Sequence, residues 1–324
     1  MIAEELGITS PAVWKAAWRM ARDEQRQFDD RLLSFGREAL DFCRSRNITP
    51  VLVLGRAYTI HNEILNSNVP SILREQGTIA LPADCFPVPS DAPVFPDIFW
   101  AQGQRILRAA WHARHQPDVY TVFCSNYSCG PDSFVVHFYA WLMEGRPFAI
   151  IETAGHTGDA GTKTRIEACL HCVAEDQHSE SHVPAKPADR LTVASGTLSE
   201  IVARHERVLI PRMGPEAGAV AAALRGIGVE AETLPMPTRE TLRIGRRHTS
   251  GKECLPMTVT LGSLLARIEP IREGDERVTF LMPGSDGPCR FGVYKNLFRI
   301  VLDRLGWGDR VRLLSPPFGD YFHG

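Results

Sequence analysis

The sequence predicts a two-domain α/β protein in which each domain holds a Rossmann-like parallel sheet, preceded by an N-terminal helical arm. Short, wholly apolar runs such as residues 50–55 and 119–123 are typical of buried parallel strands. These runs alternate with segments of helical periodicity, which indicates a parallel sheet covered by helices on both faces. With 324 residues, the chain is also long enough for two hydrophobic cores.

The first 47 residues predict the helical arm. Ser10 followed by Pro11 is a typical helix start, with a capping residue before a proline at the first helical position. Apolar residues then recur at helical spacing from Val13 to Phe42, which fits one long helix or two in series. We expect a packing arm without chemistry of its own.

Residues 48–190 predict the first α/β domain, which ends in a polar linker. Strands are expected at 50–55, 78–81, 119–123 and 147–151, and helices at 60–76, 97–115, 131–144 and 160–173. The stretch 175–190 is polar and contains Pro184 and Pro187, so it predicts a linker or an exposed loop.

Residues 191–324 predict the second α/β domain. Strands are expected at 207–210, 229–234, 277–282 and 311–314, and helices at 215–225, 254–268 and 289–305, with an irregular polar stretch before residue 254. The chain stops soon after the last predicted strand. We therefore expect this domain to be cut short and the chain to be a fragment of a longer protein.

Composition excludes several classes of function. The net charge is −2, which argues against binding nucleic acid or an anionic membrane surface. No apolar run is long enough to cross a bilayer, and the N-terminus has no signal-peptide pattern. Eight cysteines without an export signal predict a reducing, cytoplasmic setting, where cysteines more often bind metals, catalyse or lie buried than form disulfides.

Three cysteines, Cys129, Cys254 and Cys289, stand at the starts of predicted helices and have glycine or proline close by. A helix N-terminus stabilises a thiolate, and strand-to-helix loops of a parallel sheet share one edge. We therefore expect the three to converge from two domains, with Lys252 and Arg290 stabilising thiolates and the negative charge of an iron–sulfur cluster. A zinc site of three thiolates and a histidine fits the same cysteines.

The other five cysteines have weaker support as ligands. Cys169 and Cys172 form a C-x-x-C inside a helical pattern without a second pair, so we expect them, like Cys43, to be structural. Cys124 lies in an apolar strand and is expected in the core. Cys85 follows the second predicted strand and is a reserve ligand.

Further candidates follow the first and fourth predicted strands. Arg56 could hold a phosphate or a CoA group, whereas no G-x-G-x-x-G or Walker-type lysine supports dinucleotide binding. Glu152, His156 and Asp159 follow the fourth strand and are candidate catalytic groups. His156 could donate a proton or support a cluster ligand; alternatively it is a loop histidine and Asp159 caps a helix.

Several motifs together carry a family resemblance. They are Gly55-Arg56-Ala57-Tyr58 with Asn66 and Pro70, Phe99-Trp100 with Gly103-Gln104-Arg105, Asn126-Tyr127-Ser128-Cys129-Gly130-Pro131-Asp132, His156-Thr157-Gly158-Asp159, Gly251-Lys252-Glu253-Cys254-Leu255-Pro256, and Gly287-Pro288-Cys289-Arg290-Phe291-Gly292. The chain resembles the superfamily of 2-hydroxyacyl-CoA dehydratases, benzoyl-CoA reductases and double-cubane cluster proteins, and most closely the acyl-CoA dehydratase activase-related proteins.

The resemblance implies an oxygen-sensitive [4Fe-4S] or double-cubane cluster held by three cysteines per protomer of a homodimer or heterodimer. It implies low-potential electrons from an ATP-hydrolysing activase. Some members pass such an electron to an acyl-CoA thioester and form a ketyl radical. The enzyme classes that the resemblance implies are a (R)-2-hydroxyacyl-CoA dehydratase-like lyase and an ATP-coupled reductase component.

This chain departs from that family pattern at two places. Ala57 stands where the family has proline, and Thr153-Ala154-Gly155 stands where it has acidic residues. No activase domain is present, so ATP hydrolysis by this chain is not implied. Two other interpretations remain open: a non-catalytic electron-transfer or docking subunit, and a cluster-free α/β enzyme or zinc protein.

Overall fold

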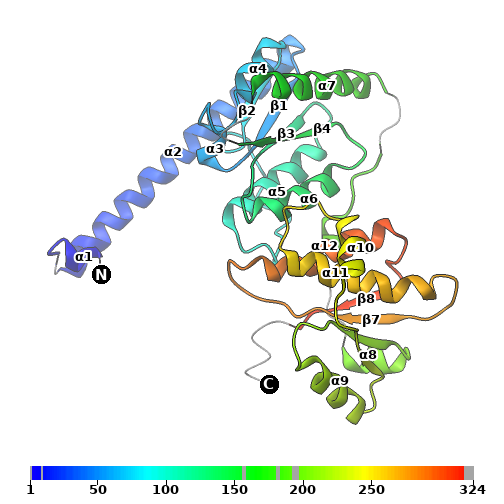
Figure 1. The fold of residues 1–324 in the computed structure, drawn as a ribbon. Coiled ribbons are helices and arrows are strands. Elements are labelled where there is room, and N and C mark those ends of the chain that lie inside the picture. Colours follow the sequence, from blue (N-terminus) through cyan, green and yellow to red (C-terminus); the bar gives the residue numbers. More distant parts are fainter. Residues whose placement is uncertain (1, 9, 155–157, 180–182, 192–196, 317–324) are drawn as a thin grey trace. The chain divides into compact units, whose positions relative to one another are not determined.

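A computed structural model describes residues 2–8, 10–154, 158–179, 183–191 and 197–316, and it confirms the predicted α/β class. The described chain contains two four-stranded sheets, ordered β2-β1-β3-β4 and β6-β5-β7-β8 (Figure 1). Strand β1 pairs in parallel with β2 and β3, and β5 pairs in parallel with β6 and β7. Both sheets therefore have the same strand order. In each sheet, the strand that comes first in the sequence lies between the second and the third.

The chain divides into two compact units, and each is assembled from separate stretches of sequence. Unit 1 comprises Met1–Ala92, His112–Cys124 and Pro147–His178, and unit 2 comprises Pro93–Trp111, Ser125–Arg146 and Ser179–Gly324. The sequence-based boundaries at residues 48 and 191 remain predictions.

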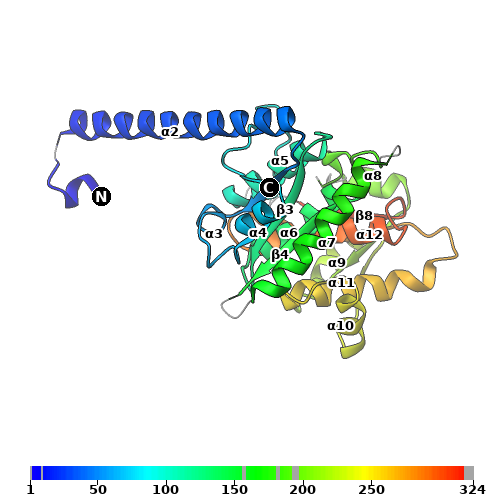
Figure 2. The same cartoon turned by 90° about the horizontal axis from the view of Figure 1, so that it is seen from above.

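Unit 1 contains the first sheet and the N-terminal helices. Its elements are α1 (Ile2–Glu5), α2 (Pro11–Arg46), β1 (Pro50–Gly55), α3 (Ala57–Ile60), α4 (Val69–Glu75), β2 (Ile79–Pro82), most of β3 (Tyr120–Asn126), β4 (Phe148–Thr153) and α7 (Asp159–Gln177). The arm is one continuous helix, α2, as Figure 2 shows. Every residue of β1 is buried, as its apolar sequence predicts for a central parallel strand.

Unit 2 contains the second sheet. Its elements are most of α5 (Ala101–Arg114), α6 (Asp132–Met143), α8 (Leu198–Ala203), β5 (Arg207–Ile210), α9 (Ala217–Gly226), β6 (Ala231–Thr233), α10 (Arg239–Arg246), α11 (Leu255–Ile268), β7 (Val278–Leu281), α12 (Tyr294–Arg304) and β8 (Val311–Leu314). Short 3₁₀ helices cover Ala188–Leu191, Glu269–Ile271 and Arg290–Val293. Val208, Ile210 and Ala231 of the sheet form a core cluster with Ala217 and Ala221 of α9.

Three expectations about helices are wrong. Residues 60–76 are not one helix, because Ser67 and Asn68 adopt positive φ angles of 51° and 57° and separate α3 from α4. Helices α8 and α10 were not expected. Thr197 and Thr238 directly precede them, and their side chains form capping boxes that supply local stability to these short helices.

Helices α10 and α11 cross at two glycines that permit backbone contact. A Cβ at Gly262 would lie 1.8 Å from the carbonyl oxygen of Thr241, and a Cβ at Gly245 would lie 2.0 Å from that of Thr258. Because α11 begins directly after Cys254, this crossing also sets the position of that cysteine.

We expect Gly262→Ala to destabilise the protein by about 1–3 kcal/mol, because the added methyl group has no room and the two helices must separate. Urea unfolding monitored by circular dichroism measures this. Gly218→Ala is the matched control, since Gly218 lies in α9 with nothing within 4 Å of the added Cβ. The control should be neutral or stabilising by up to about 1 kcal/mol, and equal losses in both variants would contradict the crossing.

Candidate functional site

Each of Cys129, Cys254 and Cys289 stands at the start of a helical turn, as predicted. All three lie in unit 2, so the expectation that they come from two domains does not match the division of the chain into compact units. Their carbonyl oxygens accept the first backbone hydrogen bonds of these turns, from Ser133 (3.1 Å), Met257 (3.0 Å) and Gly292 (3.4 Å) respectively. Cys254 differs from the expectation in one respect: it follows helix α10 rather than a strand. Each cysteine therefore directly precedes the first turn of a helix, which is the position that the sequence predicts.

The loop that carries Cys129 is held by its own backbone and by Asp132. Ser128 adopts a left-handed conformation with φ of 62°, and the N–H of Cys129 donates to the carbonyl of Asn126 at 3.1 Å. The N–H of Asn126 donates to Oδ2 of Asp132 at 3.4 Å, and Asp132 is only 1% exposed. Asp132 thus holds the loop closed, and its negative charge also stabilises the N-terminal end of helix α6.

Arg290 connects the loops of all three cysteines. Its Nη1 donates to Oγ of Ser133 at 3.1 Å and to the carbonyl oxygen of Lys252 at 3.4 Å. Its side chain also lies against Gly130, where an added Cβ would be 3.7 Å from Arg290 Cδ. Because Arg290 itself follows Cys289, these contacts bring the loops of Cys129, Cys254 and Cys289 to one guanidinium group.

Tyr294 lies close to two of the cysteines. Burial raises its pKa, and so do a hydrogen bond with the Cys254 sulfur and the nearby sulfur of Cys289; Arg290 opposes the shift. The ring stacks on Phe134 at a centroid distance of 5.7 Å, which fixes its position in α12 against α6. The protonated hydroxyl can therefore donate to a thiolate at Cys254.

Glu253 anchors the loop before Cys254. Its Oε1 accepts from the N–H and the hydroxyl of Ser250, each at 2.9 Å, and its Oε2 accepts from the N–H of Gly251 at 3.0 Å. His137 of α6 also bonds to Oε1. Burial raises the pKa of Glu253, but the hydrogen bonds from His137 and Ser250 outweigh it and lower this pKa to about 2.

Two contacts hold the loop before Cys289. The indole N–H of Trp100 donates to the carbonyl oxygen of Pro288 at 3.1 Å. Gly292 allows the loop to approach closely, because a Cβ there would lie 2.3 Å from the carbonyl oxygen of Ser285. The backbone around Cys289 is therefore fixed on both sides, although the cysteine itself is exposed.

The loops of the three cysteines carry two cations, Lys252 and Arg290, and two acids, Asp132 and Glu253. Burial lowers the pKa of Lys252, while the carboxylates of Glu253 and Asp132 oppose that shift. Lys252 and Arg290 therefore lie where the sequence places them, on the loops of the cysteines. Within the described stretches, no three histidine, cysteine, aspartate or glutamate side chains are grouped so that they could hold a metal ion.

The remaining candidates belong to unit 1. Arg56 precedes α3 and its carbonyl accepts from the N–H of Thr59 at 2.8 Å. Glu152 is in β4, and Asp159 accepts from Nδ2 of Asn68 at 3.2 Å. The residue that caps α7 is Gly158, so the capping role considered for Asp159 is wrong. His156 lies outside the described residues.

The other cysteines differ in burial. Burial raises the pKa of Cys124 to about 12 and that of Cys169 to about 11, so both thiols are inert, as predicted. Cys43 is also buried, with a pKa raised by burial. Cys172, in contrast, is exposed, so its assignment to the structural core is wrong; it lies on the solvent side of α7. Cys85 is half-buried.

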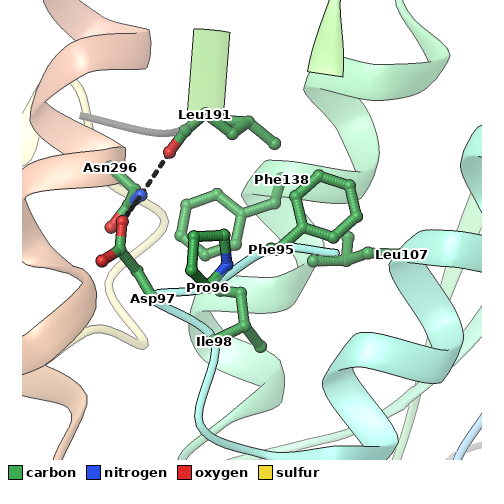
Figure 3. Close-up of a pocket in the computed structure, with 8 residues that line it drawn as sticks. All are labelled: Phe95, Pro96, Asp97, Ile98, Leu107, Phe138, Leu191 and Asn296. Atoms are coloured by element: carbon green, nitrogen blue, oxygen red, sulfur yellow. Dashed lines mark hydrogen bonds between the residues drawn. The ribbon is translucent and has the colours of Figure 1, made fainter. Parts of the chain in front are cut away.

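Unit 2 also contains a small, mainly apolar cavity. It is lined by Phe95, Pro96, Asp97, Ile98, Leu107, Phe138, Leu191 and Asn296 (Figure 3). Asn296 Nδ2 donates to Asp97 Oδ2 at 2.9 Å, and Lys295 pairs with the other oxygen of Asp97 at 2.8 Å. At most about 220 Å³ is enclosed, below the roughly 300 Å³ at which small-molecule pockets begin. The cavity is thus too small for an acyl-CoA.

Sequence reasoning missed several residues of this site. Glu253, His137, Tyr294 and Ser133 were not identified as candidates, although Glu253 directly precedes Cys254. A buried acid beside a proposed ligand is a usable signal, whereas the contacts of His137, 116 positions before Glu253 in the chain, are not visible in the sequence.

The comparisons with known proteins concern mainly the N-terminal part. Residues 1–86 match a family model described as the CoA enzyme activase uncharacterised domain (DUF2229), which supports a relation to the activase and hydroxyacyl-CoA dehydratase superfamily. No curated protein and no solved structure matches the chain. None of the described helices is both long enough and apolar enough to span a membrane.

Proposed function

We propose that this protein is an iron–sulfur protein of the 2-hydroxyacyl-CoA dehydratase type, with Cys129, Cys254 and Cys289 as the cluster ligands. It takes low-potential electrons from an ATP-dependent activase, which is a partner domain or protein. It passes them to a small substrate, for which an acyl-CoA thioester is the proposed class. The eight cysteines, all among the described residues, form no disulfide, which fits a reducing compartment, and we place the protein in the cytoplasm.

The convergence of three cysteine loops at Arg290 is the observation that carries this proposal. Three thiols at helix N-termini, with a guanidinium and a lysine beside them, suit a ligand that is both soft and negatively charged. A cluster bound there supplies one-electron transfer at low potential. The match of residues 1–86 to a CoA enzyme activase domain supports an activase-related setting.

The residues around the cysteines have separable roles in this proposal. Glu253 and Trp100 orient the loops of Cys254 and Cys289, and the hydroxyl of Tyr294 donates to the Cys254 sulfur. Arg290 ties the three loops together and offsets negative charge. Arg56, Glu152, His156 and Asp159 remain proposed groups for a CoA phosphate and for proton transfer.

The proposed activity is tested with the cluster-loaded chain under anaerobic conditions. The protein is reduced with titanium(III) citrate, and its visible spectrum is followed after addition of a (R)-2-hydroxyacyl-CoA or benzoyl-CoA. With benzoyl-CoA, which is reduced, we expect the reduced spectrum to be lost. With a (R)-2-hydroxyacyl-CoA we expect only a transient change together with formation of the enoyl-CoA, because loss of water consumes no electrons and the electron returns to the protein. A reduced protein that reacts with neither thioester would instead be the relay subunit, and a protein that binds zinc or no metal would contradict the proposal.

The role of Tyr294 gives a prediction for the reduction potential. Tyr294→Phe removes the hydroxyl donor from the Cys254 sulfur, so the negatively charged reduced state loses stabilisation and the potential becomes more negative. Redox titration of the reconstituted protein measures the shift. Tyr58→Phe is the control, because Tyr58 is an exposed tyrosine of unit 1 and should leave the potential unchanged. An unchanged potential in Tyr294→Phe would contradict the assigned hydrogen bond.

A further inference from the structure

The N-terminal part of α2 is a helix without tertiary contacts. None of the side chains from residue 11 to residue 31 is buried. Trp14 is 43% exposed, Trp18 is 59% exposed and Phe28 is 56% exposed. Each tryptophan ring has a cation of the same helix over it, Lys15 at 5.6 Å from the centroid of Trp14 and Arg22 at 4.9 Å from that of Trp18. Such a helix is marginally stable alone, because most helix stability comes from packing an apolar face.

Helix α2 has a second apolar face besides the one that packs on its own unit. Gly36, Leu40 and Cys43 form the buried face, with Gly36 so close to the backbone of Cys85 that a Cβ would lie 1.6 Å from its carbonyl oxygen. The other face follows a heptad pattern, alternating steps of four and three residues. Its positions are Trp14, Trp18, Ala21, Gln25, Phe28, Leu32, Phe35, Ala39 and Phe42. This spacing is typical of a coiled-coil seam.

The charges of this helix segment are segregated along its length. Residues 11–22 contain Lys15, Arg19 and Arg22 and no acidic residue. Residues 23–30 contain four acidic residues and one basic residue, Arg26. A second copy running parallel would place like charges together. An antiparallel copy with its axis at residue 23 places the wholly basic segment 11–22 against residues 24–35, which contain Glu24, Asp29 and Asp30 besides Arg26 and Arg31 and are net acidic.

We propose that α2 pairs antiparallel with α2 of a second copy of this chain and so makes the protein a dimer. The heptad register then places Trp18 opposite Phe28, Trp14 opposite Leu32 and Ala21 opposite Gln25, about a two-fold axis at residue 23. The segment from residue 11 to residue 31 contributes a seam about 30 Å long. This interface uses surface on unit 1 and does not depend on the proposed cluster.

Sedimentation equilibrium of the full chain tests the dimer. We expect a concentration-dependent dimer mass for the unchanged protein, and Trp18→Glu should raise the dimer dissociation constant roughly 30-fold or more, as for a central aromatic residue of an interface. Because Trp18 is exposed and its cation–π partner Arg22 belongs to the same helix, this variant should fold normally. Gln27→Glu is the matched control, since it adds the same charge outside the seam. A monomeric unchanged protein, or equal effects of the two variants, would overturn the proposal.

A photo-crosslinking residue in place of Trp14 tests the orientation. Antiparallel pairing predicts crosslinks to the segment around residues 28–36 of the second copy, identified by mass spectrometry in the dimer band. Crosslinks to residues 10–18 of a second copy would show parallel pairing. Crosslinks confined to one chain would show that another part of the same chain covers this face of α2. Either of these last two results would overturn the proposal.

Discussion

Replacing Cys129, Cys254 or Cys289 with serine should abolish cluster binding in each case. Serine keeps the size of the side chain but supplies a hard hydroxyl in place of a soft thiolate, and soft thiolates select iron–sulfur clusters. We expect the bound iron to fall more than about tenfold, since loss of an outer partner of a metal ligand already costs 10–100-fold in affinity. Iron and acid-labile sulfide per chain, measured after anaerobic reconstitution, report this loss.

Two other cysteines provide matched controls. Cys172→Ser changes an exposed thiol in α7, and Cys43→Ser changes a buried thiol in α2, both in unit 1. Both variants should retain iron and sulfide at the level of the unchanged protein. If the loss were confined to variants at these control positions, the ligand assignment would be wrong.

Replacing Glu253 should give the largest loss of stability. Glu253→Ala leaves His137 and the N–H groups of Ser250 and Gly251 without their acceptor in a buried site. Each buried donor that is left without its acceptor costs about 1–3 kcal/mol. Urea unfolding of the metal-free protein measures the loss, and the loop of Cys254 should become accessible to a thiol reagent at lower urea concentrations than the rest of the chain.

The pH dependence of unfolding provides a second measurement for Glu253. Its pKa is lowered from 4.5 to about 2 in the folded protein, so its carboxylate stabilises the fold fully above pH 4.5. That contribution, roughly 3 kcal/mol, is lost as the pH falls from about 4.5 toward 2. Glu253→Gln should lack this part of the acid dependence.

An exposed glutamate serves as the control for both measurements. Glu240→Gln changes an acid on the surface of α10 whose partner, Arg243, is also exposed. Its effect on the free energy of unfolding should be much smaller than that of the Glu253 variants, because an exposed ion pair contributes little to stability. Equal effects of the Glu240 and Glu253 variants would contradict the anchoring role of Glu253.

The apolar runs were sufficient to predict both sheets, because a buried parallel strand needs apolar residues on both faces. The last strand was expected at 311–314, and β8 has these bounds. Helices α8 and α10 were missed for the opposite reason. Each is too short to show a clear helical period, α10 is also mostly polar, and both begin with a capping box, which a periodicity search does not detect.

The candidate site was predictable where it depends on local sequence. Glycine and proline around Cys129, Cys254 and Cys289 indicate turns before helices, and the structure places all three there. The contact of Arg290 with Ser133, 157 positions away, depends on tertiary packing, as does the bond between His137 and Glu253. The turns that carry the three cysteines could therefore be predicted from the sequence, but the tertiary contacts that hold these loops together could not.

Iron and acid-labile sulfide in protein purified without oxygen test most directly whether the three cysteines hold one cluster. We predict a brown protein with iron and sulfide in equal amounts, and a triple serine variant at Cys129, Cys254 and Cys289 that is folded but colourless. A colourless unchanged protein that holds zinc or no metal, and that cannot be reconstituted with iron and sulfide, would contradict the proposed cluster.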